Sequence, residues 1–203
     1  MRLTILGLFL LGFWVLSGLQ PPTRAQAGGD TPQERIAAGR LLFEQTAGGM
    51  GCAVCHGNFG MGDLGMGSYI RGIGEQQVRD SLESVEAMAS LSLSEEEIRA
   101  VTTYLQWLGT LVPAEVFFKR GTFTPSELRV TAGKTVQLII TNSDRTEHRF
   151  TNLPLGIENF TVPSRSALDV IFTVPTTEGS FSLSCLECGP DSIPLAVIVR
   201  PAE

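Results

Sequence analysis

Hydrophobic and polar residues follow a helical period in the first half of the chain. Two segments begin with a capping box, Thr31-Pro32-Gln33-Glu34 and Ser94-Glu95-Glu96-Glu97, in which the first side chain caps the helix and the glutamate closes the box. Apolar residues recur at helical spacing after the second start. The pattern predicts helices over about residues 31–45 and 94–109, and a helix-like segment covers residues 76–85.

From residue 115 onwards the period changes to two. Val136, Leu138 and Ile140 lie on one face of a predicted strand, which indicates a sheet with a buried face. A series of short strands separated by turn signals favours a β-sandwich. The predicted strands cover residues 116–118, 127–130, 135–141, 146–151, 167–174, 179–183 and 195–199.

The change of period also divides the chain. We predict an all-α domain over residues 28–109, a linker over residues 110–114 and an all-β domain over residues 115–203. A chain of this length accommodates two small domains. The fold class is therefore an all-α domain followed by an all-β Greek-key sandwich.

The N-terminus has the pattern of an export signal. A short basic start precedes an uncharged apolar run over residues 3–19, and Ala25-Gln26-Ala27 is a cleavage pattern of small residues. This predicts a signal peptide over residues 1–27. The alternative is an uncleaved membrane anchor formed by residues 3–19. Either way the remaining chain is predicted to be periplasmic or otherwise extracytoplasmic.

The charge of the exported part narrows the class of partner. Removal of residues 1–27 takes away Arg2 and Arg24 but no acidic residue, so 13 basic and 21 acidic residues remain and the net charge is −8. Such a chain is a poor partner for nucleic acid. Complementary charge on a redox protein is a more plausible use, because it speeds transient encounter. The alternative is that the charge only keeps the protein soluble.

Candidate chemistry begins with Cys52-Ala53-Val54-Cys55-His56, whose C-x-x-C-H spacing is the attachment signature of a c-type haem. Two thiols on one short turn add to the two vinyl groups of the porphyrin, and the next histidine becomes the proximal iron ligand. The cysteine pair alone would also suit a disulfide or half of a zinc site. The complete motif predicts one covalent haem c, and the glycine-rich loop over residues 57–74 is expected to wrap it.

The distal iron ligand is predicted to be Met88, because a methionine at that position suits electron transfer. Met50 precedes the motif. Met61 and Met66 follow His56 too closely to reach the opposite haem face. Met88 lies beyond the segment 76–85 and just before the last capping box, from where it can approach that face. The alternative for Met88 is an ordinary core methionine.

The first domain resembles a class I cytochrome c domain over residues 31–109. The resemblance implies electron transfer, with the distal methionine in a turn just before the last helix, where this chain has Glu86-Ala87-Met88-Ala89-Ser90. It also implies that Gly39 lets the first and last helices cross closely, with Phe43 and Tyr104 beside the crossing. The resemblance rests on Gly39 and Phe43, on Cys52-Ala53-Val54-Cys55-His56-Gly57, on Gly62-Asp63-Leu64-Gly65, and on Tyr104-Leu105 in the last helix.

The second domain resembles a cupredoxin over most of residues 115–200. The resemblance implies that His148 and Cys185 occupy the positions of the first histidine and the cysteine ligand of a copper site. It rests on Phe123-Thr124-Pro125, Leu128, Val130, Ala132-Gly133, Val136, Leu138, Asn142, Asp144, His148 and Phe150, and on the segments 172–175 and 179–185.

The copper site of this family is incomplete here. The segment Cys185-Leu186-Glu187-Cys188-Gly189 is similar to the binuclear copper (CuA) loop of cytochrome oxidase subunit II. The positions of the following histidine and methionine hold Ser192 and Leu195. Three interpretations remain open. Cys185 and Cys188 form a disulfide, or they hold a single copper ion with His148, a ligand set that suits Cu(I), or the domain holds no centre and serves for docking.

These observations favour an exported electron-transfer protein with one haem c. Its cupredoxin-like domain is expected to dock on a redox partner, such as a terminal oxidase, a reductase or another cytochrome, or to hold a second redox centre. One alternative is a copper-handling or thiol-redox sensing protein that uses Cys185 and Cys188. Another is an accessory cytochrome subunit of an oxidase or reductase complex. No enzyme activity is expected, because Met88 fills the sixth iron position and no nucleophile–histidine–carboxylate arrangement or phosphate loop is present.

Overall fold

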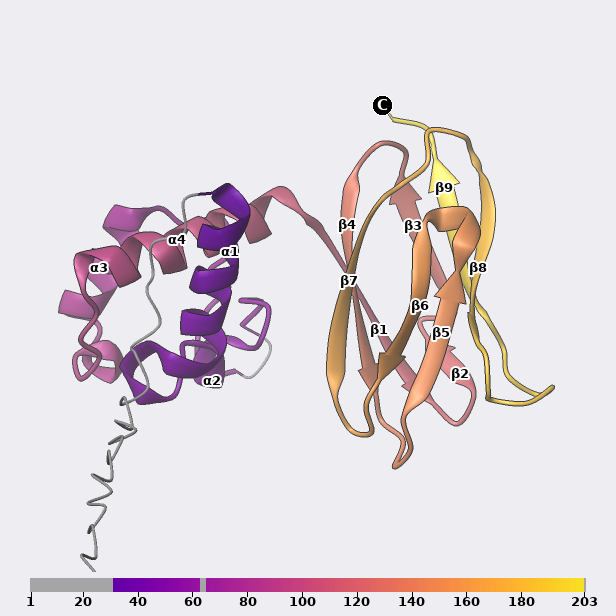
Figure 1. Cartoon of the computed structure of the whole chain (residues 1–203), viewed down its shortest axis with the longest axis horizontal. Coiled ribbons are helices and arrows are strands. Elements are labelled where there is room, and N and C mark those ends of the chain that lie inside the picture. Colours follow the sequence, from indigo (N-terminus) through magenta and orange to yellow (C-terminus); the bar gives the residue numbers. More distant parts are fainter. Residues whose placement is uncertain (1–30, 63–64, 203) are drawn as a thin grey trace, which may run out of the picture.

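The computed structural model describes residues 31–62 and 65–202. The predicted signal peptide, residues 1–27, and its apolar run over residues 3–19 lie outside the described residues. Figure 1 shows a helical domain beside a β-sandwich, with the chain passing from one to the other at the end of a long helix. Among the described residues, no helix has the length and apolar character needed to cross a membrane.

The helical domain contains the helices that the sequence predicts. The segment 31–45 forms α1 and the π-helical turn η1, residues 76–85 correspond to α3, and residues 94–109 correspond to α4. Both predicted capping boxes are present. The helical elements of the described residues are α1 (Pro32–Leu41), η1 (Leu42–Thr46), η2 (Ala47–Gly49), α2 (Ala53–His56), α3 (Glu75–Ser84), η3 (Glu86–Met88) and α4 (Glu95–Thr110).

Helices α1 and α4 cross at Gly39, as the sequence resemblance implied. A Cβ atom on Gly39 would lie 2.0 Å from the backbone oxygen of Ala100 and 2.8 Å from Cβ of Tyr104, so a larger residue cannot occupy this position without displacing α4. The rings of Phe43 and Tyr104 pack beside the crossing, with centroids 5.6 Å apart, and both side chains are fully buried. The crossing therefore fixes the position of α1 relative to α4.

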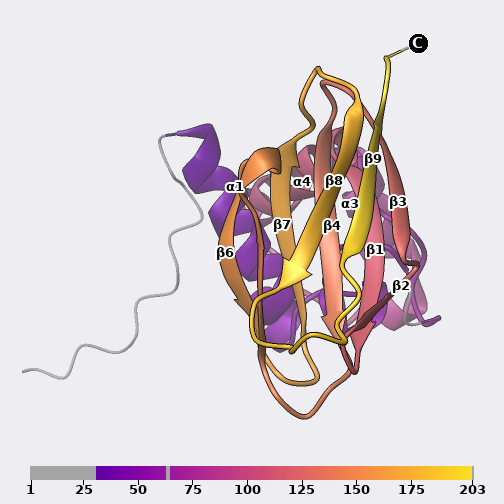
Figure 2. The same cartoon turned by 90° about the vertical axis from the view of Figure 1, so that its right-hand side faces the viewer.

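The C-terminal half forms a two-layered β-sandwich (Figure 2), as predicted. One sheet has the strand order β2-β1-β4-β7 and the other β3-β9-β8-β5-β6. Strand pairs β1–β4 and β3–β9 are parallel, and the other pairs are antiparallel. The elements are β1 (Val112–Lys119), β2 (Thr122–Thr124), β3 (Glu127–Thr131), β4 (Thr135–Asn142), β5 (His148–Asn152), η4 (Leu153–Leu155), β6 (Ile157–Val162), β7 (Ala167–Thr173), β8 (Gly179–Cys185) and β9 (Leu195–Arg200).

Strand β4 is buried on both of its faces. Val136, Leu138 and Ile140 point into the sandwich core, as the alternation predicts, and are at most 1% exposed. Gln137 and Ile139 point to the other face, where a polar residue would normally meet water, but they are only 0% and 4% exposed. The helical domain covers this outer face of the sheet (Figure 1). The outer face of β4 is therefore buried by contact with the helical domain.

The predicted linker, residues 110–114, is shorter in the structure than the sequence suggests. Helix α4 continues through Gly109 to Thr110, and β1 begins at Val112, which pairs with Val136 of β4. Gly109 does not end the helix but allows a close approach, since a Cβ atom there would lie 2.5 Å from Cα of Gly72. Only Leu111 separates the two elements, and it is buried.

A buried polar network joins the two domains. Arg71 of the helical domain donates from Nη1 to Oε1 of Gln137 (2.6 Å) and to the backbone oxygen of Phe59 (3.1 Å), and from Nη2 to the backbone oxygen of Leu108 (2.7 Å). Nε2 of Gln137 donates to Oδ2 of Asp169 (2.8 Å). The guanidinium of Arg71 therefore bonds to both domains at once.

The same carboxylate receives a second contact from the helical domain. Oδ1 of Asp169 accepts a hydrogen bond from Nη2 of Arg40 at 2.9 Å, and the Asp169 side chain is only 3% exposed. Burial lowers the pKa of Arg71, yet a guanidinium stays protonated at neutral pH. Arg40 therefore pairs directly with Asp169, whereas the charge of Arg71 is stabilised by neutral acceptors, the Gln137 amide oxygen and two backbone carbonyls.

Replacement of Arg71 by alanine is expected to destabilise the full chain by about 2–4 kcal/mol, because Gln137 and two backbone carbonyls lose their donor while buried. Urea unfolding measures this change. Arg129→Ala is the matched control, since the Arg129 side chain is 60% exposed and pairs with Glu127 on the surface, and it should change stability by less than about 1 kcal/mol. Equal losses in the two variants would contradict the assigned role of Arg71.

Candidate functional site

The haem-attachment motif folds as one helical turn. Helix α2 spans Ala53–His56 directly after Cys52, and the amide of His56 donates to the backbone oxygen of Cys52 at 3.0 Å. Gly57, with φ 75°, ends the turn in a conformation that favours glycine. This turn brings together the three residues predicted to hold haem, Cys52, Cys55 and His56. The two cysteines are not bonded to each other.

The imidazole of His56 is held by a backbone carbonyl. Nδ1 lies 2.8 Å from the backbone oxygen of Ser68. A carbonyl oxygen only accepts hydrogen bonds, so Nδ1 carries the proton and Nε2 keeps its lone pair. Metal-bound histidines are commonly oriented by this kind of second contact. The geometry therefore suits coordination of iron by Nε2 of His56.

The loop after the motif lies directly against this imidazole. The amide of Gly67 donates to the backbone oxygen of Cys55 at 2.9 Å, and a Cβ atom on Gly67 would lie 2.6 Å from Nδ1 of His56. Next to it, the side chains of Met66 and Tyr69 are 67% and 55% exposed. Burial raises the pKa of the Cys52 thiol to about 11. The site therefore has two thiols that are not bonded to each other, an oriented imidazole, and exposed apolar side chains beside that imidazole. These features suit the covalent attachment of a large apolar group such as haem.

Met88 lies in a different segment. It ends the 3-10 turn η3 between α3 and α4, is half-buried, and has its amide bonded to the backbone oxygen of Val85 at 2.8 Å. The position between the last two helices is the one that the sequence predicts. The assignment of Met88 as the distal iron ligand stays a prediction.

A second cluster of ligand-type side chains lies at one end of the sandwich. His148 begins β5, Cys185 ends the neighbouring strand β8, and Cys188 follows in the next loop. Their ligand atoms all lie within 4.8 Å of one another, and the three residues are half-buried. Nδ1 of His148 is 3.4 Å from Sγ of Cys188 and 3.9 Å from Sγ of Cys185. The structure thus brings together all three residues of the predicted copper or disulfide site.

Of the predicted states of this cluster, the structure contains the disulfide. Cys185 and Cys188 are joined, with their Cα atoms 5.6 Å apart. Copper coordination would require the same two sulfurs in reduced form, because thiolates are the ligands that soft metals prefer. The disulfide and the three-ligand copper site are therefore two oxidation states of one set of atoms.

The residues at the other copper-ligand positions have different partners. The hydroxyl of Ser192 donates to the backbone oxygen of Gly121 at 3.0 Å. Leu195 is fully buried in the sandwich core. Glu187 forms an ion pair with Arg149. Within the described residues, the cluster accordingly offers one nitrogen and two sulfurs to a metal.

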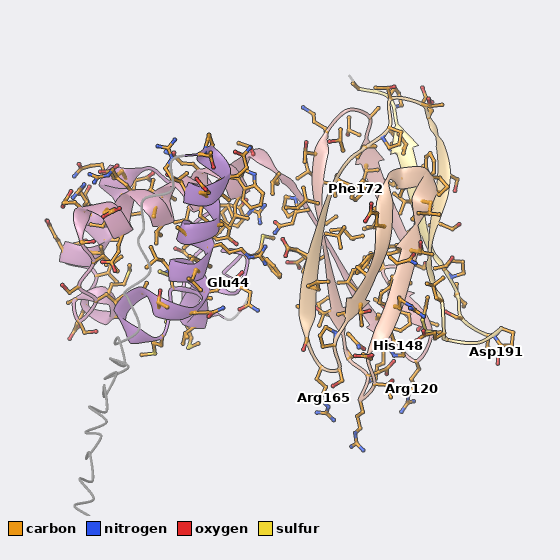
Figure 3. The ribbon with its side chains drawn as sticks, in the orientation of Figure 1. Glu44, Arg120, His148, Arg165, Phe172 and Asp191 are labelled. Carbon is orange, nitrogen blue, oxygen red and sulfur yellow. A yellow bond between two sulfur atoms is a disulfide. The ribbon has the colours of Figure 1, made fainter. Side chains whose placement is uncertain are left out.

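Asp144, which the sequence analysis named only among the residues that carry the cupredoxin resemblance, orients His148. Its Oδ2 accepts from Nε2 of His148 at 3.1 Å and from the amide of Arg120 at 2.8 Å, and its backbone oxygen accepts from the amide of Arg165 at 3.1 Å. Figure 3 shows His148 at this end of the sandwich with Arg120 and Arg165 in nearby turns. Both arginines have positive φ, 50° and 52°, and their bonds to Asp144 help to hold them in this uncommon region.

Charged side chains of both signs lie around the cluster. Lys119, Arg120, Arg145 and Arg165 are exposed on the turns that meet at Asp144. Glu147 is also exposed there, and the loop that carries the sulfurs adds the exposed acids Glu187 and Asp191.

Comparison with known proteins supports the assignment of the sandwich. The model of the Cupredoxin-like domain matches residues 109–192, so this part of the chain is a cupredoxin-like domain. The comparison with curated proteins found no match.

Several solved structures are similar to the chain over less than half of its length. The periplasmic domain of subunit II of cytochrome oxidase (CoxB) of Bradyrhizobium japonicum is 17% identical, with 44% of this chain and 84% of that chain covered and a TM-score of 0.38. Auracyanin A, a "blue" copper protein of Chloroflexus aurantiacus, is 18% identical, with 44% and 98% covered and a TM-score of 0.34. Auracyanin of Roseiflexus castenholzii is 13% identical, with 46% and 100% covered and a TM-score of 0.37.

Replacement of Asp144 by alanine is expected to lower the free energy of unfolding by about 1–3 kcal/mol, because a half-buried imidazole and a backbone amide lose their acceptor. Thermal or urea unfolding of the full chain measures the loss. Asp191→Ala, which removes an exposed carboxylate from the loop after Cys188, should have an effect below about 0.5 kcal/mol. A loss for Asp144→Ala no larger than that of the control would show that Asp144 does not hold the turns together.

Proposed function

We propose that this chain is an exported electron-transfer protein that carries one haem c. Cys52 and Cys55 attach the haem, His56 is the proximal iron ligand and Met88 is the distal one. The observation that carries the proposal is the complete C-x-x-C-H motif on a single helical turn, with Nδ1 of His56 committed to the backbone oxygen of Ser68. When bound, haem c supplies one-electron exchange between Fe(II) and Fe(III).

The protein residues then have separate tasks. Cys52 and Cys55 hold the group covalently, so that it is not lost during transient encounters. The Ser68 carbonyl fixes the ring orientation of His56, and Gly67 leaves room for that ring. Exposed apolar side chains such as Met66 and Tyr69 become covered and help to exclude water. On this proposal the haem site carries electrons and is not a catalytic centre.

The cupredoxin-like domain is proposed to serve for docking on a respiratory partner. A terminal oxidase, a reductase or another cytochrome is the class of protein expected, in the periplasm or another extracytoplasmic space. The buried network of Arg71, Gln137 and Asp169 supports this role, because it makes the sandwich a fixed extension of the helical domain. An accessory cytochrome subunit of an oxidase or reductase complex would use the same arrangement.

A second candidate function is copper handling by His148, Cys185 and Cys188. The observation that favours it is the mutual distance of their ligand atoms, all within 4.8 Å. Two thiolates and one imidazole form a set that suits Cu(I). The second candidate requires that the disulfide be reduced before the metal binds.

The mature chain should be isolated from an exporting, haem-attaching and copper-supplied host and analysed for covalent haem, iron and copper. The proposal expects a chain mass increased by one haem, one iron per chain, and reversible reduction and reoxidation of that iron in a potentiometric titration. A chain without covalent haem would contradict the electron-transfer function. Stoichiometric copper beside the iron would support the second candidate as an additional centre.

The Met88→His variant is expected to lower the reduction potential, because a thioether ligand raises the haem potential relative to imidazole. A potentiometric titration of the holoprotein, with absorption spectra at each step, checks the shift. Met66→Leu, at a 67% exposed position, is the matched control and should leave both the potential and the spectrum nearly unchanged. If Met66→Leu rather than Met88→His moves the potential, the distal ligand is wrongly assigned.

A further inference from the structure

The disulfide Cys185–Cys188 is poorly placed to act as a structural staple. It joins residues only three positions apart in the sequence, and the constraint that a disulfide imposes on the unfolded chain is smallest for the shortest loops. The strand that leads into it, β8, is already paired with β5 and β9 through backbone ladders. The fold therefore gains little from this bond, and another role is needed to account for it.

The surroundings of the two sulfurs are those of a reactive pair. C-x-x-C is the spacing of dithiols that open and close during thiol–disulfide exchange. Both cysteines are half-buried at the end of a strand rather than enclosed in the core. Nδ1 of His148 lies 3.4 Å from Sγ of Cys188 and 3.9 Å from Sγ of Cys185.

The imidazole is also fixed in the orientation that such a pair requires. Nε2 of His148 bonds to the Asp144 carboxylate at 3.1 Å, which turns Nδ1 towards the sulfurs. The ring of Phe118 packs against that of His148, with centroids 4.9 Å apart. Carboxylate, imidazole and sulfur thus form a continuous line of contacts, the arrangement in which an oriented histidine assists a cysteine.

We propose that Cys185 and Cys188 form a thiol–disulfide exchange centre whose substrates are dithiols of other exported proteins. His148 acts beside Cys188, and Asp144 is a positioning residue for His148. This activity goes beyond the proposed electron transfer and does not depend on the haem. It also assigns a role to the one pair of cysteines that the haem motif leaves unused.

The exchange is balanced in atoms and electrons. A thiol of the substrate attacks Sγ of Cys185, a substrate–Cys185 bond forms and the Cys185–Cys188 bond breaks. Cys188 leaves next to Nδ1 of His148 and takes up the proton that the attacking thiol gives off. The second substrate thiol then attacks the mixed disulfide and releases Cys185. The substrate dithiol is oxidised to a disulfide, and the chain gains two thiols.

The test uses the full mature holoprotein and dithiothreitol as the probe dithiol. Thiols are trapped with a maleimide and counted by mass, and only Cys185 and Cys188 respond, because Cys52 and Cys55 are held as thioethers. We expect two thiols to appear, at a rate at least about tenfold above that of oxidised glutathione, a small unassisted disulfide, under the same conditions. A rate equal to that of oxidised glutathione would overturn the proposal.

Variants separate exchange from fold stability. His148→Phe keeps an aromatic ring beside Phe118 but lacks Nδ1, and it should slow the reduction by about tenfold or more at a temperature where its unfolding curve shows the variant to be fully folded. Asp144→Asn should have a smaller effect in the same direction. The exposed Arg129→Ala variant is the control and should exchange at the wild-type rate. If both His148→Phe and Asp144→Asn exchange at the wild-type rate, neither His148 nor Asp144 takes part in the exchange.

Failure of this inference and failure of the proposed function give different results. A chain without haem overturns only the electron-transfer function. Exchange is then measured in the Cys52→Ser/Cys55→Ser double variant, in which the thiol count comes from Cys185 and Cys188 alone. A holoprotein isolated with one copper per chain and both thiols already reduced overturns the exchange centre and leaves the haem assignment intact.

Discussion

The arrangement of this protein depends on the buried guanidinium of Arg71. It bonds to Phe59 and Leu108 within the helical domain and to Gln137 on the sheet. Because Arg71 and Gln137 are at most 6% exposed, separation of the domains would break the bond between them and leave both polar side chains without this partner. The two domains therefore behave as one unit, and the distance between the haem motif and the sulfur cluster is set by the fold rather than by a flexible linker.

The sequence predicts those features that depend on local patterns. Capping boxes located α1 and α4, the C-x-x-C-H spacing located α2, and alternation located the buried face of β4. It missed β2, which is only three residues long, and β6. In β6 the buried residues Ile157 and Val162 are five positions apart, and the pairing with β5 contains a register shift, so no simple alternation marks the strand.

The features that sequence analysis did not find depend on tertiary contacts. Arg71, Gln137 and Asp169 are polar residues of types that mostly lie on the surface, and only the contact between domains gives them partners. The predicted bounds of the linker were wrong for the same reason. Val112 belongs to β1 because it pairs with β4, and this pairing is a tertiary contact. Asp144 was part of the cupredoxin resemblance, but its bond to His148 requires the β4–β5 loop to fold back on itself.

The two histidines of the chain illustrate how a fold prepares a side chain for chemistry. His56 binds a backbone carbonyl through Nδ1 and so presents Nε2, whereas His148 binds a carboxylate through Nε2 and so presents Nδ1. Both acceptors are oxygens without protons to donate, and each therefore selects one tautomer of the neutral ring. The Ser68 carbonyl lies in the loop that follows the haem motif. The Asp144 carboxylate lies in a turn that is hydrogen-bonded to the turns of Arg120 and Arg165. The haem motif and its histidine are therefore readable as one short segment, whereas at the second site the sequence shows His148, Cys185 and Cys188 but only the fold shows that Asp144 orients His148.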